Sequence, residues 1–283
     1  GVRLGAVPPL WQRLLRAQQV WTERTLAAVD GQDLPIETAV ARDHQGVSSG
    51  LVVHETPFSR LVRLRAARSG PPILLIAPYS GYAGAVLSEL AAGLLPAGEV
   101  FFLDWRDARL VPSTLGPFGI TEQLALVVQA IQLVGEPVHL LAVSQSGAVT
   151  LAAAALAAAG GKGLARPRSL SLLGAPIGMP ERAAAVDWLP ASVERSGMAD
   201  RLIATVPERY PGAGRRVYPG LWQLLTVAAT NPATFFETQA GFWAELLADE
   251  PGRYGRLHAD LHRVADVADA VADYRGTDRG VQR

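Results

Sequence analysis

Ser144 is the residue whose surroundings most clearly indicate chemistry. It follows an apolar run at residues 138–143, and small residues lie two positions before it and two after it, Ala142 and Ser146. A very sharp turn from a strand into a helix needs small residues at these two places, and such a turn exposes its serine hydroxyl as a nucleophile. The N-terminus of the following helix would favour a negative charge, so the backbone N–H of Gln145 is the expected first oxyanion donor. The pattern predicts acyl transfer by a serine nucleophile.

Two alternatives stay open at the same turn. Ser144 could serve only as the cap of the helix, because serine is a favoured N-cap residue. Ser146 is also framed by small residues, Ser144 and Ala148. Because Ser146 would lie inside the helix, we prefer Ser144 as the nucleophile.

A second oxyanion donor should come from the loop after the first strand of the sheet. This loop has the sequence APYSGY at residues 77–82, and we choose the backbone N–H of Tyr79 within it. The alternative is an ordinary turn built from proline and glycine.

Short apolar segments alternate with helical segments around these residues. Strands are expected at 73–77, 100–104, 138–143 and 170–173, and helices at 83–95, 121–134 (capped by Thr121) and 147–159. This alternation indicates βαβ units in a parallel sheet with helices on both faces, hence an α/β fold class. Residues 51–53 and 60–65 predict an additional antiparallel pair of half-exposed strands. Ser144 follows the third parallel strand, where an α/β-hydrolase carries its nucleophile.

No further strand is predicted beyond Pro176. Residues 181–274 are expected to form helices that are interrupted by prolines and rich in aromatic residues. We expect these helices to form a C-terminal cap on an α/β-hydrolase-like sheet that is incomplete. The predicted organisation is an N-terminal helix and linker at 1–48, an α/β-hydrolase core at 49–180, and the helical cap and tail at 181–283, all within one structural domain.

The N-terminal segment is predicted to be an amphipathic helix. Apolar residues recur at helical spacing over residues 10–29, and Asp30 and Gly31 end the pattern. Its apolar face could pack against the core, or it could contact an apolar surface such as a lipid or a polymer inclusion.

The composition excludes several classes of function. The chain has 26 basic and 26 acidic residues and no cysteine, so we expect no nucleic-acid partner, no disulfide and no thiolate metal site. His258 and His262 lie four residues apart on an expected helix but have no evident third ligand, and we predict neither a metal nor a cofactor. No secretory signal or transmembrane segment is evident, so a cytoplasmic location is expected.

Several stretches between about residues 50 and 230 carry a family resemblance. They are VHETPF at 53–58, APYSG at 77–81, DWRDARLVP at 104–112, VSQ at 143–145, residues 170–177 and VYPG at 217–220. Through them the chain resembles the intracellular polyhydroxyalkanoate (polyhydroxybutyrate) depolymerases and, more distantly, the polyester synthases. The resemblance implies an α/β-hydrolase fold and hydrolysis of 3-hydroxyalkanoate esters at storage granules.

Two features depart from that family's pattern. Its members usually have cysteine where this chain has Ser144, and they continue past the cap into strands that carry the Asp and His of a triad. Here the tail at 273–280 does not resemble a strand, and none of the histidines has the expected place in the chain order; they are His44, His54, His139, His258 and His262. The general base and acid are therefore not identified, although serine needs an adjacent base more than cysteine does.

Two functions are consistent with these patterns. The first is a carboxylic ester hydrolase that cleaves 3-hydroxyalkanoate polyester or oligoester through Ser144, with the N–H groups of Gln145 and Tyr79 holding the oxyanion. The second is a catalytically incomplete, truncated homologue that binds a polyester granule or a protein. In the second case the aromatic residues of the cap would form the contact surface and could also join copies of the chain; they are Trp222, Phe235, Phe236, Phe242 and Trp243.

Overall fold

The computed structural model describes residues 9–30, 35–43, 50–65, 70–79, 83–135, 137–160, 165–175, 177, 202–220, 222, 228–229, 232–248, 252, 254–255 and 267–268. By its internal contacts the chain divides into two compact units. The smaller unit combines Gly1–Gln32 with Leu221–Val264, and the larger combines Asp33–Gly220 with Ala265–Arg283. The predicted boundaries after residues 48 and 180 stay a prediction.

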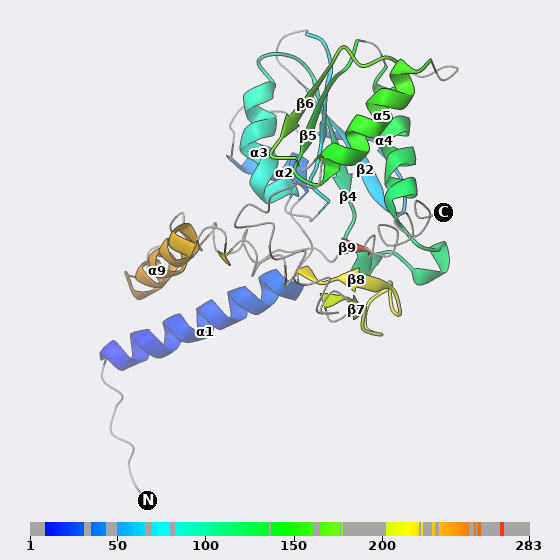
Figure 1. Cartoon of the computed structure of the whole chain (residues 1–283). Coiled ribbons are helices and arrows are strands. Elements are labelled where there is room, and N and C mark those ends of the chain that lie inside the picture. Colours follow the sequence, from blue (N-terminus) through cyan, green and yellow to red (C-terminus); the bar gives the residue numbers. More distant parts are fainter. Residues whose placement is uncertain are drawn as a thin grey trace, which may run out of the picture. The chain divides into compact units, whose positions relative to one another are not determined.

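A six-stranded sheet forms the centre of the larger unit, in the order β1-β2-β4-β3-β5-β6 (Figure 1). Its strands are β1 (Leu51–Glu55), β2 (Ser59–Leu64), β3 (Ile73–Ile76), β4 (Val100–Trp105), β5 (His139–Val143) and β6 (Ser169–Leu173). The last four are parallel to one another, whereas β1 and β2 are antiparallel strands at one edge. This topology confirms the predicted α/β class.

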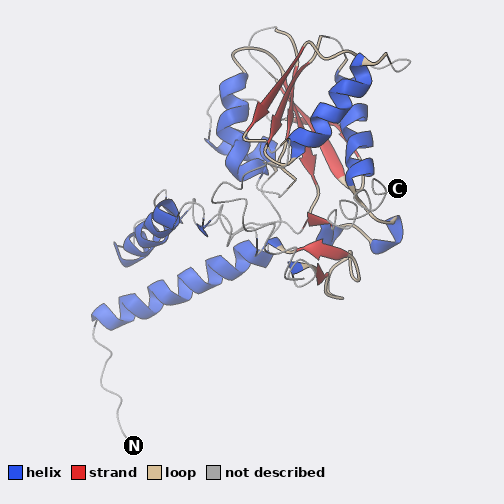
Figure 2. Ribbon diagram, viewed as in Figure 1, coloured by secondary structure: helices blue, strands red, loops and turns tan. Residues whose placement is uncertain are grey.

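Helices cover both faces of this sheet (Figures 1 and 2). They are α2 (Ile36–Asp43), α3 (Ala83–Leu94), α4 (Ile120–Val134) and α5 (Ser146–Ala158). On one face, side chains of α2 and α3 such as Val40 and Leu87 pack with Leu75 of β3. On the other face, Ile131 of α4 packs with Leu74. Neighbouring residues of β3 therefore point to opposite faces, as expected for a strand that is buried on both sides.

Two details of the larger unit differ from the sequence-based prediction. Helix α2 was not predicted, because eight residues give too few turns to establish a helical period. The expected cap residue of α4, Thr121, is wrong: the N-cap is Gly119. The N–H of Gly119 donates a hydrogen bond to Glu122 Oε2 at 2.8 Å, so the glutamate satisfies the start of the helix in place of the threonine.

A second, three-stranded antiparallel sheet contradicts the expectation that no strand follows Pro176. It consists of β7 (Ala204–Thr205), β8 (Arg216–Tyr218) and β9 (Val267–Ala268). Strands of two or three residues are too short to display an alternating pattern, which is why the sequence did not reveal them.

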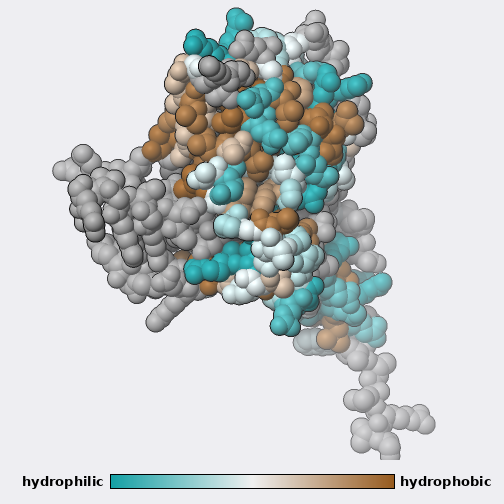
Figure 3. All heavy atoms as spheres, turned by 90° about the vertical axis from the view of Figure 1, so that its right-hand side faces the viewer, coloured by the Kyte–Doolittle hydropathy of each residue, from teal (hydrophilic) through white to brown (hydrophobic). Residues whose placement is uncertain are grey.

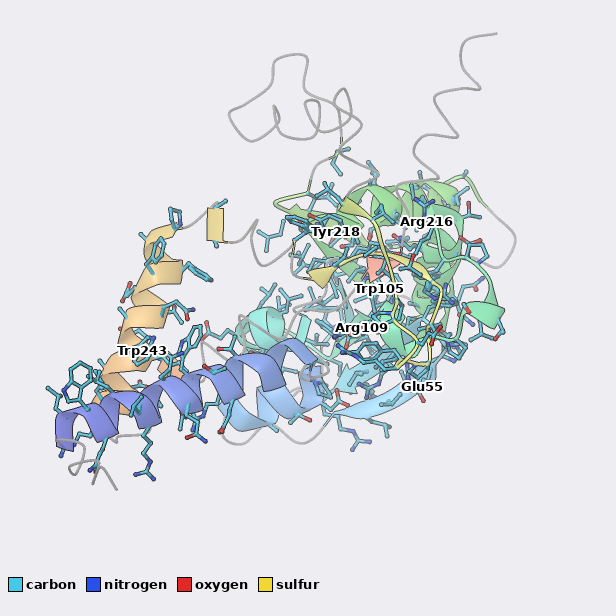
Figure 4. The ribbon with its side chains drawn as sticks, turned by 90° about the horizontal axis from the view of Figure 1, so that it is seen from below. Glu55, Trp105, Arg109, Arg216, Tyr218 and Trp243 are labelled. Carbon is cyan, nitrogen blue, oxygen red and sulfur yellow. The ribbon has the colours of Figure 1, made fainter. Side chains whose placement is uncertain are left out.

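The smaller unit contains two long helices, α1 (Pro9–Asp30) and α9 (Pro232–Ala248). The predicted N-terminal helix is thus confirmed. Its Trp21 stacks on Trp243 of α9 with ring centroids 6.3 Å apart, and Figure 4 shows Trp243 between the two helices. Arg24 lies over the ring of Phe242, which is only 1% exposed. Of the five aromatic residues expected on a contact surface, Phe242 is therefore buried within this unit and Trp243 is partly buried against α1.

The surface of the described residues is mixed in polarity. Figure 3 shows hydrophilic and hydrophobic residues interspersed over one face. Among the helices of the described ranges, none combines the length and apolarity that a bilayer span requires.

Candidate active site

Ser144 lies in the turn between β5 and α5 and has an unusual backbone conformation. Its φ is +55°, and no other non-glycine residue in the described ranges has a positive φ. The left-handed region costs an L-residue roughly 1–2 kcal/mol, so the surrounding structure must hold it there. The Ser144 N–H donates to the Leu173 carbonyl at 2.9 Å, and the Ser144 carbonyl accepts from the Gly147 N–H at 3.0 Å. Both bonds fix the turn.

Ser146 is the first residue of α5, and it has a structural role. Its side chain is only 2% exposed. The hydroxyl accepts a hydrogen bond from the Val143 N–H at 3.2 Å and lies within donating distance of two carbonyl oxygens, 2.9 Å from Val143 and 3.2 Å from Ile76. These contacts tie the end of β5 to the end of β3. The Ser146 hydroxyl therefore stabilises the turn between β5 and α5.

Gly147 explains why a small residue is needed just after the turn. A Cβ placed at this position would overlap the Cβ of Ala175, which follows β6. The first turn of α5 therefore approaches the chain beyond β6 so closely that only glycine fits without a shift of the backbone.

The register of the sheet brings the expected site residues to one edge. Ile76 of β3 pairs with Ala142 of β5, so the residues that follow these adjacent strands leave the sheet together at its carboxyl edge. Neighbouring strands lie about 4.8 Å apart. Tyr79 and Gln145 thus flank the same edge as Ser144. The N–H groups in the first turn of a helix have no partner within the helix, which suits Gln145 to bind an anion.

The side chain of Tyr79 belongs to an aromatic cluster, which we define as Phe58, Tyr79, Trp105 and Phe118. The rings of Phe58 and Phe118 are stacked at 4.3 Å, and Tyr79 meets Trp105 edge-on at 6.0 Å. The Trp105 Nε1 donates to the Ala77 carbonyl at 3.0 Å. The cluster therefore supports the loop after β3, from which the second oxyanion donor is expected.

Arg215 closes this cluster from the C-terminal part of the chain. It is 6% exposed and its guanidinium lies over the Phe58 ring at 5.3 Å. Its N–H groups donate to the carbonyls of Val111 at 3.1 Å, Pro112 at 2.6 Å and Gly116 at 2.8 Å. The three bonds satisfy backbone carbonyl groups of the segment around the 3-10 helix η2 (Ser113–Leu115).

Burial lowers the pKa of the Arg215 guanidinium, and nearby Tyr79 partly offsets this effect by raising it. The cation is therefore desolvated, and the three carbonyl dipoles replace water around it. Sequence reasoning missed this residue because Arg215 stands beside a second arginine, Arg216, and nothing in the pattern marks one of them as buried.

A buried ion pair orders the stretch that precedes this segment. Arg109 Nη2 lies 2.6 Å from Asp107 Oδ2, and its guanidinium also lies over the Tyr210 ring. The Arg109 carbonyl accepts from the Gly212 N–H at 2.8 Å. Figure 4 shows Trp105 and Arg109 in this part of the larger unit. The DWRDARLVP stretch and the β7–β8 segment therefore pack as one structure.

The two described histidines do not lie near Ser144. His139 begins β5, five residues before Ser144 and about 16 Å away along the strand, and its Nδ1 lies 2.7 Å from Ser169 Oγ. His54 is in β1, four strands away from β5 in the sheet. His44, His258 and His262 lie outside the described residues, as does the tail at 273–280. Within the described ranges no group of three or more His, Asp or Glu side chains could hold a metal ion.

A mostly parallel sheet covered on both faces, with a sharp serine turn after its third parallel strand, is typical of an α/β-hydrolase-like fold. Residues 174–273 match the family model described as PHB de-polymerase C-terminus. This match agrees with the resemblance found in the sequence.

Solved structures show similarity at low identity. A bacterial membrane phospholipase A is 17% identical with a TM-score of 0.40, and the match covers 66% of this chain and 52% of that protein. An α/β hydrolase from Sphaerobacter thermophilus is 18% identical (TM-score 0.33; 76% and 69% covered), and a hydrolase from Pseudomonas aeruginosa PA01 is 17% identical (0.38; 80% and 75%). The chain thus spans about half of the length of the phospholipase. No curated protein matched the sequence. The fold assignment rests on the chain's own topology.

Proposed function

We propose that this chain is a carboxylic ester hydrolase that acts on 3-hydroxyalkanoate polyester or oligoester through Ser144. The observation that carries the proposal is the positive φ of Ser144 at the turn between β5 and α5. Backbone strain of this kind persists where the surrounding structure enforces it, and strained residues cluster at functional sites. The turn between strand and helix is also the place where α/β-hydrolases present their nucleophile. The match to the PHB depolymerase family supports the choice of substrate.

The proposed reaction begins with attack of Ser144 Oγ on the ester carbonyl carbon. A tetrahedral intermediate forms, and its oxyanion accepts hydrogen bonds from the backbone N–H groups of Gln145 and Tyr79. Collapse breaks the ester C–O bond, the departing alkoxide takes up the proton lost from Ser144 Oγ and leaves as the alcohol end of the hydroxyalkanoate, and an acyl-serine remains. Water then cleaves the acyl-serine and releases the acid. The base that takes the Ser144 proton is not assigned, and the positions of His54 and His139 argue against both of them.

The substrate class also implies a place of action. A 3-hydroxyalkanoate polymer is stored in granules, so the proposed activity belongs in the cytoplasm at the granule surface.

The direct test compares two serine variants with a soluble ester, p-nitrophenyl butyrate. Ser144→Ala should abolish turnover, whereas Ser146→Ala should retain most of it and lose about 1 kcal/mol of stability, because its hydroxyl only closes the turn. Equal loss of turnover in two folded variants would show that the turn is structural and would count against Ser144 as the nucleophile.

The second candidate, a binding module without catalysis, makes a different prediction. Such a protein would adsorb to amorphous polyhydroxybutyrate and would not hydrolyse either the polymer or the soluble ester. Exposed aromatic residues favour it: Phe236 and Trp222 are both exposed. Release of 3-hydroxybutyrate from the polymer, lost in Ser144→Ala, would decide in favour of the hydrolase.

A further inference from the structure

The first two turns of α1 carry an exposed apolar surface. Leu10 is 64% exposed, Trp11 58% and Leu15 63%. With Leu14 they occupy about 140° of the helix circumference, since successive residues of an α-helix are about 100° apart. We call these four residues the N-terminal apolar face.

Much of this face lies away from the packing contact of α1 with α9. Trp21 stacks on Trp243 and Arg24 lies over the Phe242 ring, and Ala17, on the same side of α1, is buried. Trp11 and Leu15 lie about 120° around the helix from these residues. The two side chains are therefore not required for the pairing of the two helices.

The charged side chains in this part of the sequence are all positive. Residues 1–22 contain three arginines and no acidic residue, in a chain whose formal net charge is zero. Two of them, Arg13 and Arg16, are exposed on the side of the helix opposite the apolar face. A helix that combines tryptophan and leucine on one side with arginine on the other has the character of an interfacial helix, which lies at the boundary of headgroups and acyl chains.

We propose that the first two turns of α1 bind the surface of an anionic phospholipid layer. Trp11 and Leu15 enter the boundary between headgroups and acyl chains, and Arg13 and Arg16 pair with lipid phosphates. This binding is separate from the proposed ester hydrolysis, because it involves neither Ser144 nor the aromatic cluster.

The test is flotation of the full-length chain with vesicles of phosphatidylcholine alone or mixed with phosphatidylglycerol. The chain should float with the anionic vesicles and should bind them less as salt is raised. Trp11→Ser with Leu15→Ser should weaken partitioning at least about tenfold through the loss of buried apolar area. Arg13→Gln with Arg16→Gln should weaken it by roughly 30-fold, at about fivefold for each charge.

Leu115→Ser is the matched control, because Leu115 is an exposed leucine of the larger unit, 49% exposed, and its loss should leave binding unchanged. Circular dichroism should show equal helix content in all variants. The proposal fails if the chain does not float with anionic vesicles, or if the two double variants float like the parent. It also fails if Trp11→Ser with Leu15→Ser abolishes only self-association or only adsorption to polyhydroxybutyrate. Those results would assign the face to a second copy or to the polymer.

Discussion

Ser144 combines an unfavourable backbone conformation with a turn that holds it in place. A serine that served only as a helix cap would adopt an extended conformation, which costs nothing. Here the hydrogen bonds of Ser144 to Leu173 and Gly147 and the buried hydroxyl of Ser146 fix the turn. The geometry therefore gives the two serines different roles. Ser144 has the strained conformation at the turn beyond β5, and the Ser146 hydroxyl stabilises that turn.

The strain at Ser144 predicts a trade between stability and activity. Glycine has no Cβ and accepts a positive φ, so Ser144→Gly should raise the free energy of unfolding by about 0.5–1 kcal/mol while removing ester turnover. Urea unfolding, followed by circular dichroism, measures the first effect. Ser144→Ala is the control, because it also removes the hydroxyl but keeps the Cβ, and its stability should stay near that of the parent. A Ser144→Gly variant that is less stable than Ser144→Ala would contradict the assignment of strain.

A residue such as Ser144 can be predicted from the sequence, because the sharp turn requires small residues at fixed positions on either side of it. The sequence also predicted that Ser146 lies inside the helix, and it is the first residue of α5. The burial of Arg215 could not be predicted in this way, because it depends on carbonyls about a hundred residues earlier in the chain. No local pattern encodes such a partner.

At the scale of elements, the start of α5 is the most tightly constrained point of the sheet. Gly147 lets the helix approach the chain after β6, and this approach sets the position of the helix N-terminus relative to Ser144. A helix displaced by even one methyl group would move the Gln145 N–H away from the proposed oxyanion.

A pair of glycine variants tests this constraint. Gly147→Ala should destabilise the protein by about 1–3 kcal/mol, because the new methyl group overlaps Ala175, and it should lower turnover as well. Gly93→Ala, in α3, should instead stabilise the protein by about 0.5–1 kcal/mol, because nothing lies within 4 Å of the added Cβ and alanine favours a helix. Thermal unfolding of both variants measures the difference. Equal effects at the two positions would show that α5 has room to move.

The predictable elements were those with enough length to establish a period. The β-strands and α-helices between residues 51 and 173 lie within two residues of their predicted bounds, as do the ends of α1, because apolar runs and helical spacing determine them locally. Helix α2 and strands β7, β8 and β9 have between two and eight residues. Their formation depends on partners that are distant in the chain, so local spacing did not indicate them.

For the whole molecule, the arrangement of histidines determines how activity should respond to pH. His139 starts β5 at the end opposite Ser144, and His54 belongs to the outermost strand. If neither acts on Ser144, no described imidazole titrates with catalysis. Ester turnover should then be weak and change by less than about twofold between pH 6 and 8.

Steady-state rates with p-nitrophenyl butyrate across this range provide the measurement. The competing expectation is that His258 or His262 serves as the base. Activity would then rise through about pH 6.5 as the imidazole loses its proton, and one of the two His→Ala variants would lose that rise. Such a profile would overturn the prediction of unassisted attack while leaving Ser144 as the nucleophile.

Arg215 and the carbonyls that it contacts also have a consequence for the timing of biosynthesis. The ribosome delivers residues 111–116 well before Arg215, which lies 99 to 104 residues further along the chain. Domains fold as the chain emerges from its N-terminal end, so the central sheet can form while these carbonyls are still bound to water. The aromatic cluster can close only after Arg215 has left the ribosome. Once about 200 residues have emerged from the ribosome, the chain would thus hold Ser144 in place but leave the loop that carries Tyr79 without its final support, and the site proposed around Ser144 would mature late in translation.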